Sequence, residues 1–176
     1  MNPCLIVVDV QNGFITNRET RQVEARIKTL LAANLFETVI FTQFINAPNS
    51  PYRTLMNWHG LSTPETQALA ESLQPFAEIV FQKDGYSSIT QTVLDYLKAQ
   101  QIDVAFVLGI DTDCCVLQTA VDLFAQTIHP YVLAHYSASG GGIESHNAGL
   151  KVLERLIGRQ NIIQEELTGE RLQQLL

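Results

Sequence analysis

Apolar residues gather in short runs along the chain, and longer amphipathic segments separate these runs. The runs are apolar at successive positions, which is typical of strands in a parallel sheet that is covered on both faces. The pattern therefore predicts an α/β protein. The expected strands are Leu5 to Val10, Thr38 to Gln43, Glu78 to Gln82, Val104 to Gly109, Tyr131 to Ala134 and Asn161 to Ile163.

The segments between the runs carry apolar residues at helical spacing. Ile27, Leu30 and Leu31 form such a stripe, which marks the face of a helix that packs on a sheet. Right-handed crossovers with one reversal of direction give the strand order 3-2-1-4-5-6. We therefore expect a single domain over residues 1–176, with a Rossmann-like, three-layer α/β/α fold around a six-stranded, mainly parallel sheet. The expected helices are Thr20 to Ala33, Ser88 to Gln100, Asp113 to Gln126, Glu144 to Ile157 and Thr168 to Leu175.

The stretch from Ile45 to Pro64 does not fit this alternation. It holds three prolines, the aromatic residues Tyr52 and Trp58, and also Arg53 and His59. It is too long and too irregular for a simple connection. In an α/β protein such a segment is usually a lid over a binding site or a contact between subunits.

Composition narrows the class of protein. The 176 residues are 46% hydrophobic and 16% charged, with a net charge of −7, which favours a sizeable core and disfavours the phosphate backbone of a nucleic acid. No apolar run approaches the roughly 20 residues that cross a bilayer, and no secretory leader precedes Cys4. We therefore expect a cytoplasmic protein that binds a small molecule and neither nucleic acid nor membrane.

Three residues with useful chemistry lie at the ends of predicted strands. Asp9 interrupts an apolar run, Lys83 closes the third strand, and Cys115 follows the fourth. Ligands of such folds bind outside the carboxyl ends of the strands where the order reverses, here between the first and fourth strands. A buried Asp9 needs a partner, and Lys83 can supply it. Cys115 falls in the first turn of a helix, where free amides and the helix dipole lower the pKa of a thiol.

Each of these residues also has a plain structural alternative. Asp9 can cap a local loop, Lys83 can be a solvated surface charge, and Cys115 can pack as a small apolar residue, as Cys4 is expected to do. The three cysteines, with Cys114 and Cys115 adjacent, suit neither a disulfide framework nor a zinc site. Any chemistry of these cysteines is therefore expected to be thiol chemistry.

Three motifs occur in order along the chain, each at a predicted strand end. They read Asp9-x-Gln11-Asn12-x-Phe14, then Lys83-x-x-Tyr86-Ser87, then Gly109-Ile110-x-Thr112-x-x-Cys115-Val116-x-x-Thr119-Ala120. Over nearly the whole chain, this pattern resembles the isochorismatase-like cysteine hydrolase superfamily.

The resemblance implies a three-layer α/β/α fold and a catalytic triad of Asp9, Lys83 and Cys115. It also implies a cis peptide between Ile110 and Asp111, with the backbone amides of Asp111 and Cys115 as an oxyanion hole. Members of the superfamily commonly form homodimers or homotetramers, which we expect here as well. The candidate substrate-binding residues are Phe14, Tyr52, Arg53, Trp58 and Tyr86.

The chain departs from the superfamily's pattern at several positions. Nicotinamidases carry a metal motif, Asp-x-His with a later His, just after the second strand, whereas this chain reads Phe41-Thr42-Gln43-Phe44-Ile45-Asn46. We therefore expect no metal and no cofactor, and place the chain in a metal-free branch closer to the amidohydrolases than to nicotinamidase. His135 stands where an Asp is usual, and Asp111 where a small or neutral residue is often found.

Two residues close to the motifs are expected to take no direct part in catalysis. Cys114 precedes the motif cysteine, and adjacent helical residues point about 100° apart, so the two thiols should not face one pocket. His146, near the start of a predicted helix, is expected to be structural.

The expected function is hydrolysis of a carbon–nitrogen bond in a small amide, imide or ureido compound, through a thioester on Cys115. An alternative is the vinyl-ether hydrolysis of isochorismatase, which does not need the thiol that this chain retains. A second alternative is a non-catalytic ligand-binding or scaffold protein on the same fold. A phosphoacceptor receiver domain is disfavoured, because Val10 and Lys83 occupy positions where it needs acidic residues.

Overall fold

The computed structural model describes residues 1–176, and a six-stranded sheet forms its centre. All neighbouring strands are parallel, in the order β3-β2-β1-β4-β5-β6. The predicted strand order is therefore confirmed, and the sheet, expected to be mainly parallel, is parallel throughout. The strands are β1 Pro3–Val8, β2 Thr38–Phe44, β3 Ile79–Lys83, β4 Val104–Ile110, β5 His129–Ala138 and β6 Ile162–Ile163.

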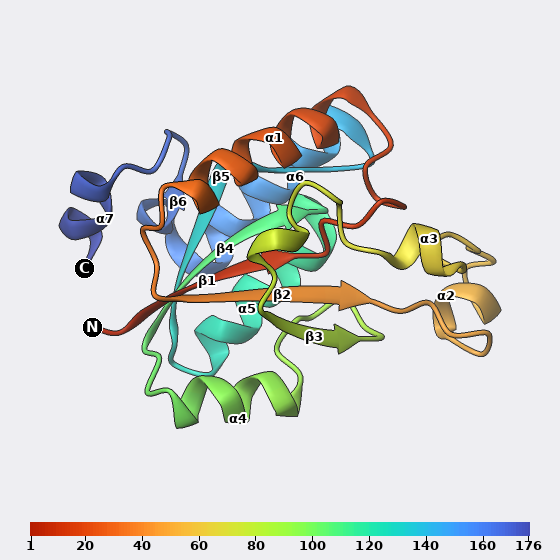
Figure 1. Ribbon diagram of the computed structural model, residues 1–176, viewed down its shortest axis with the longest axis horizontal. Helices are drawn as coiled ribbons and strands as arrows, with labels where there is room; N and C mark the ends of the chain where they lie inside the picture. Colours follow the sequence, from red (N-terminus) through yellow and green to blue (C-terminus); the bar gives the residue numbers. More distant parts are fainter.

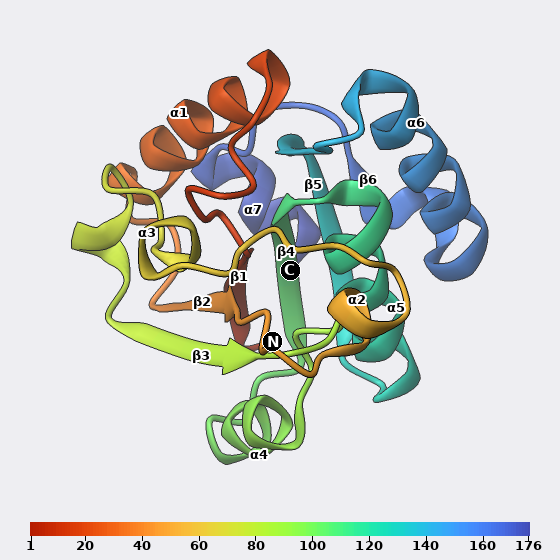
Figure 2. The same cartoon turned by 90° about the vertical axis from the view of Figure 1, so that its right-hand side faces the viewer.

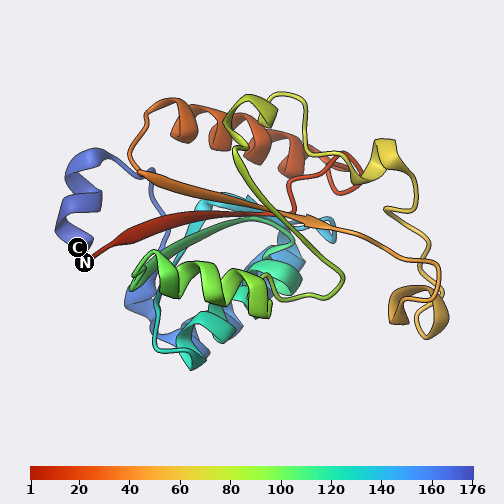
Figure 3. The same ribbon diagram turned by 60° about the horizontal axis from the view of Figure 1, so that its bottom comes forward.

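Helices cover both faces of the sheet, so that the structure has three layers (Figures 1 and 3). Leu5 and Val7 of β1 point into the core on one face, and Ile6 and Val8 into the core on the other. This alternation explains why the central strands are apolar at every position. The first face carries α1 (Arg18–Ala32) and α7 (Gly169–Leu175), and the second carries α4 (Gln91–Ala99), α5 (Leu117–Ala125) and α6 (Gly142–Leu153).

β5 is longer than its apolar run predicts. It continues past the expected end at Ala134 to Ala138. The pairing of β4 with β5 shifts register between Val107 and Gly109, and Ser137 lies opposite Gly109 just past this shift. The Ser137 hydroxyl donates to the Leu133 carbonyl at 3.0 Å and accepts the Gly109 N–H at 3.3 Å, so that a polar side chain inside the sheet is satisfied.

Several helices differ from the predicted spans. The helix expected from Asp113 to Gln126 begins with a separate π-helical turn, Thr112–Val116, before α5. α6 is likewise followed by a π-helical turn, Glu154–Gly158, and α4 begins late because Thr90 caps its first turn. The longest helix, α1, has 15 residues, and no helix is long and apolar enough to cross a membrane.

The two central strands end side by side at one edge of the sheet. β1 and β4 pair from Pro3 opposite Val104 to Val8 opposite Gly109. Gly109 has a φ of +129°, and a Cβ at this position would lie 2.1 Å from the Val8 carbonyl oxygen. Only glycine permits such a close approach of two backbones. The chain therefore leaves β1 and β4 at the same edge of the sheet, directly before Asp9 and before the turn that carries Cys115.

The irregular stretch, residues 45–64, projects beyond this edge, and we call it the lid segment (Figures 1 and 2). It contains the short helix α2 (Pro51–Thr54) and leads into α3 (Pro64–Gln67). Asn46 braces it from inside, because its side-chain amide donates to the carbonyls of Trp58 and Gly60 at 3.3 and 2.7 Å. The lid segment is therefore an ordered loop with its own hydrogen bonds.

Candidate active site

Asp9 and Lys83 form a buried ion pair at the carboxyl edge of the sheet. Asp9 directly follows β1, and Lys83 is the last residue of β3. Lys83 Nζ lies 2.7 Å from Asp9 Oδ2, and both side chains are at most 1% exposed. Since β2 lies between β1 and β3, the long lysine side chain reaches across one strand to the carboxylate.

Hydrogen bonds hold this pair in one orientation. Thr42 of β2 donates its hydroxyl to Asp9 Oδ1 at 2.8 Å. Lys83 Nζ donates to the carbonyls of Gly85 and Tyr86, both at 2.9 Å. Two carbonyls and the carboxylate therefore surround the ammonium group. A buried ion pair of this kind is weak evidence for stability alone, which favours a functional reason for its presence.

The turn that carries Cys115 begins directly after β4. The peptide between Ile110 and Asp111 is cis, as the resemblance implies. The next residues form the π-helical turn, in which the Val116 N–H donates to the Asp111 carbonyl at 3.1 Å. The backbone amides of Asp111 and Cys115 both belong to this stretch, which runs from the cis peptide into the π-helical turn.

The Cys115 thiol lies beside the ion pair, close enough for both charges to act on it, and Cys115 is only 6% exposed. Burial, followed by the charge of Asp9, raises the pKa of this thiol well above its usual range, and Lys83 opposes the shift only in part. The expectation that the helix start lowers this pKa is therefore wrong, because burial outweighs the amides. The direction of this shift favours the neutral form of the thiol, and the Asp9 carboxylate lies beside it.

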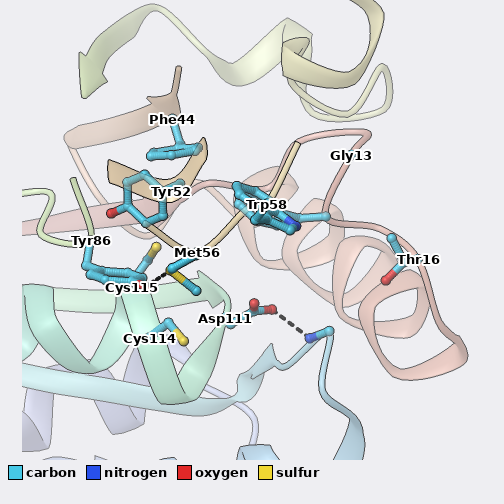
Figure 4. A pocket seen from close by; sticks show the side chains of 12 residues that line it. Gly13, Thr16, Phe44, Tyr52, Met56, Trp58, Tyr86, Asp111, Cys114 and Cys115 are labelled. Carbon is cyan, nitrogen blue, oxygen red and sulfur yellow. Dashed lines mark hydrogen bonds between the residues drawn. The ribbon is translucent and has the colours of Figure 1, made fainter. Parts of the chain in front are cut away.

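A cavity of about 300 Å³ lies beside Cys115 (Figure 4). Its wall includes five aromatic rings, those of Phe14, Phe44, Tyr52, Trp58 and Tyr86. Phe14 and Trp58 are almost parallel, with centroids 6.2 Å apart, whereas Tyr52 meets Tyr86 edge-on at 5.1 Å. The volume and the apolar wall suit a small organic molecule.

Four of the five candidate substrate-binding residues line this cavity: Phe14, Tyr52, Trp58 and Tyr86. Arg53 is not part of the wall. Its Nη2 instead donates to the Asn46 carbonyl at 2.7 Å, so that it braces the lid segment.

Cys114 also lines the cavity, contrary to the expectation that the two thiols face different surroundings. The expectation assumes an α-helical turn, whereas this turn is π-helical and its side chains follow a different spacing. Burial raises the pKa of Cys114 to about 11, and the charges of Asp113 and Asp111 add to the shift.

Asp111 points its carboxylate toward the loop after β5. Oδ1 accepts the Gly140 N–H at 2.6 Å, the bond drawn in Figure 4. Burial raises the pKa of this carboxyl from 3.8 to about 6; the Gly140 bond opposes the shift, and the charges of Asp113 and Asp9 add to it. Asp111 therefore brings an acidic side chain into a mainly apolar cavity wall.

The two histidines near the motifs lie outside the cavity wall. His146 of α6 pairs its Nδ1 with the Thr112 hydroxyl at 2.8 Å, and burial lowers its pKa. It therefore supports the first residue of the π-helical turn, in line with a structural role. His135 in β5 accepts a hydrogen bond from Arg26 through its carbonyl, and burial followed by the Arg26 charge lowers its pKa.

The residues at the end of β2 and just after it do not fit the metal site of nicotinamidases. Gln43 Nε2 donates to the Gln67 carbonyl at 2.9 Å, and the Asn46 amide is engaged within the lid segment. No group of three or more His, Cys, Asp or Glu side chains converges anywhere in the structure. These amide side chains are committed to backbone partners and are poor ligands for a transition metal.

The sequence interpretation misses several residues around the site. Thr42 carries a signal, because it is a polar residue within an apolar run, but its contact with Asp9 depends on the pairing of β1 with β2. Thr16, Met56 and Gly140 also line the cavity. They come from loops whose path the apolar pattern does not predict.

Known proteins are similar to this chain in sequence or in fold. The family model of the isochorismatase domain matches residues 3–161. The nicotinamidase of Acinetobacter baylyi is 28% identical, over 75% of this chain and 79% of that protein. The crystal structure of an isochorismatase-like hydrolase from Alkaliphilus metalliredigens superposes with a TM-score of 0.82 at 21% identity, over 99% of both chains. N-carbamoylsarcosine amidase from Thermoplasma acidophilum gives 0.75 at 22% identity, over 87% of this chain and 93% of that one. The chain belongs to the isochorismatase family of hydrolases.

Proposed function

We propose that the protein is a cysteine hydrolase that cleaves the carbon–nitrogen bond of a small amide, imide or ureido compound through a thioester. The observation that supports this most directly is the position of the Cys115 thiol beside the buried pair of Asp9 and Lys83, next to an aromatic cavity. A nucleophile, a proton acceptor and a fixed positive charge, shielded from water, are what attack on a carbonyl carbon requires.

In the first half of this mechanism, Asp9 takes the proton of the Cys115 thiol while the sulfur attacks the substrate carbonyl. The carbonyl oxygen becomes negatively charged, and the backbone amides of Asp111 and Cys115 donate hydrogen bonds to it. The carbon–nitrogen bond then breaks, and the proton passes from Asp9 to the departing nitrogen. Ammonia or an amine leaves, and the acyl group stays on the sulfur.

In the second half, a water molecule attacks the thioester and Asp9 accepts its proton. The carbon–sulfur bond breaks, the acid product leaves, and the proton returns to the Cys115 sulfur. Lys83 keeps the Asp9 carboxylate oriented through both halves and stabilises the negative charge that passes between Asp9 and the sulfur. The high pKa of the resting thiol fits this cycle, because it makes a neighbouring base necessary.

The cavity gives a reason to prefer an amide over isochorismate as the substrate. Isochorismate carries two carboxylates, whereas the cavity wall offers it the carboxylate of Asp111 and no Lys, Arg or His side chain. Like charges in a partly desolvated site repel. Vinyl-ether hydrolysis also has no need of the Cys115 thiol, whereas amide hydrolysis through a thioester does.

Substitution of the candidate catalytic residues tests the proposal. With a panel of small amides and ureides, and ammonia release as the assay, we expect Cys115→Ala and Asp9→Asn each to lower kcat by about 10⁴-fold or more. Cys114→Ala is the matched control, because it removes a neighbouring thiol that does not contact the ion pair, and it should keep most of kcat. Mass spectrometry of the wild-type enzyme mixed with substrate should detect the acyl group on Cys115. Equal losses in the two cysteine variants would contradict the assignment.

A further inference from the structure

The charges around the candidate site are not balanced. Asp9 is neutralised by Lys83 at 2.7 Å. Asp111 has no such partner, because the ion pairs in the structure join Lys83 to Asp9, Arg159 to Glu154 and Arg171 to Glu165. Among the residues that line the cavity, Asp111 is the one acidic residue, and no Lys, Arg or His is present. The cavity is therefore a site of net negative charge.

The Asp111 carboxylate borders open space within the cavity. A Cβ built on Gly140 would lie 3.4 and 3.7 Å from the two carboxylate oxygens and 3.8 Å from the Thr16 hydroxyl. The carboxylate and the hydroxyl thus flank one spot that the glycine leaves free. In Figure 4, Asp111 lies below the Trp58 ring, with the two cysteines to one side and Thr16 to the other.

The rest of the wall is suited to the same kind of group. Five aromatic rings and the Met56 thioether surround the space beside Asp111. The faces of aromatic rings attract ammonium groups, most strongly those of tryptophan. A carboxylate in the same cavity as an aromatic wall therefore favours a cation and disfavours an anion.

We propose that the substrate is a small amide or ureide that carries a positive charge, such as an ammonium or trimethylammonium group, held between the Asp111 carboxylate and the aromatic wall. This inference rests on the proposed amide hydrolysis and specifies its substrate class. In this arrangement the backbone amide of Asp111 donates to the substrate's carbonyl oxygen, and the carboxylate of the same residue binds the cation. The positive charge must therefore be joined to the acyl group within a few bonds of the carbonyl, as in an α-ammonio or β-ammonio amide.

Three amides of matched size test the charge preference. They are (trimethylammonio)acetamide, its uncharged isostere 3,3-dimethylbutanamide, and the anion malonamate. Binding is measured by calorimetry on the Cys115→Ala variant, which cannot turn them over, and Trp58, the single tryptophan, provides an independent fluorescence signal from the cavity wall. We expect the cationic amide to bind about tenfold or more tightly than the neutral one, and malonamate to bind most weakly.

Two variants assign the preference to Asp111. Asp111→Asn on the same background keeps an acceptor for the Gly140 N–H and removes the charge, so the preference for the cation should disappear while the neutral amide binds as before. Asp113→Asn, an acidic residue of the same turn outside the cavity wall, should retain the preference. Gly140→Ala keeps the charge but places a methyl group in the free spot, and should weaken binding of the cation.

The outcomes separate this inference from the proposed function. Equal binding of the cationic and neutral amides, no measurable binding of the cationic amide, or a preference that survives Asp111→Asn would each overturn the inference. Ammonia release is measured separately on the wild-type enzyme. If the cation binds selectively but no amide is hydrolysed, the proposed hydrolysis fails and the charge selectivity stands.

Discussion

At Asp111 the protein keeps a carboxyl group largely out of water and near other negative charges. Burial raises its pKa from 3.8 to about 6. A pKa that is higher in the folded than in the unfolded state means that the native protein binds this proton more tightly. The resulting stabilisation is fully present below the unfolded value and is lost as the pH rises through about 6. The ionised form of Asp111 is therefore less favourable in the folded state than in the unfolded state.

Replacing this group with its neutral counterpart should stabilise the protein. We expect Asp111→Asn to raise the free energy of unfolding at pH 8 by about 1–3 kcal/mol, because the amide needs no desolvation of a charge and still accepts the Gly140 N–H. The gain should shrink as the pH falls through 6. Urea unfolding at several pH values measures it. A gain of the same size and pH dependence in Asp113→Asn would show that the effect is not specific to the cavity.

The candidate site residues that can be predicted from the sequence are those whose side chains contrast with their apolar neighbours. Asp9, Lys83 and Cys115 stand out because each is a polar or nucleophilic residue where an apolar run ends, and the topology then brings these ends together. The direction of the pKa shift at Cys115 is predicted wrongly, because the local motif shows the turn but not how deeply it is buried. The orientation of Cys114 is missed because it depends on the π-helical turn.

At the scale of elements, the lid segment connects the cavity wall to the sheet. Its aromatic side chains meet residues from other elements, with Trp58 stacked on Phe14 and tilted against Phe44 of β2. Gln11, which follows β1, binds the Phe44 backbone through both ends of its amide, at 2.8 and 3.0 Å. The lid segment is thereby held against the ends of the two strands from which Asp9 and Thr42 reach the site.

Truncating the tryptophan of the lid segment should weaken substrate binding without removing the catalytic groups. We expect Trp58→Ala to raise KM by about tenfold, corresponding to the loss of about 1.4 kcal/mol of ring contacts, with a much smaller change in kcat. Steady-state kinetics measures both. His59→Ala is the matched control, because His59 is exposed and lies outside the cavity wall. An unchanged KM together with a changed mass in light scattering would place Trp58 at a subunit contact instead.

The elements themselves are predicted well where packing alone decides them. Every strand predicted from an apolar run is present in the sheet. The errors fall where individual side-chain hydrogen bonds accompany the end of an element. Ser137 lies in the part of β5 that is not predicted, and Thr90 caps α4 later than expected. The irregular stretch is predicted to be a lid or a contact, but its path, and hence the place of Arg53 within it, depends on side-chain bonds such as that to Asn46.

For the molecule as a whole, the distribution of ligating side chains leads to a prediction about metals. Because no three His, Cys, Asp or Glu side chains converge, we expect activity to survive exhaustive dialysis against a chelator. Metal analysis of the dialysed protein, alongside the ammonia assay, checks this. An activity that is lost on chelation and restored by zinc or manganese would mean that the protein binds a metal through fewer or rearranged ligands.

The position of β1 has a consequence for how the chain is synthesised. This strand is made before the others but lies in the middle of the sheet, and Pro3 lies opposite Val104 of β4. At about 5–20 residues per second, a ribosome delivers that partner ~5–20 s later. Until then, one edge of an apolar strand is open to other chains. Cys115 follows β4 in the next turn, so the nascent chain acquires its candidate nucleophile just after the strand that closes this edge.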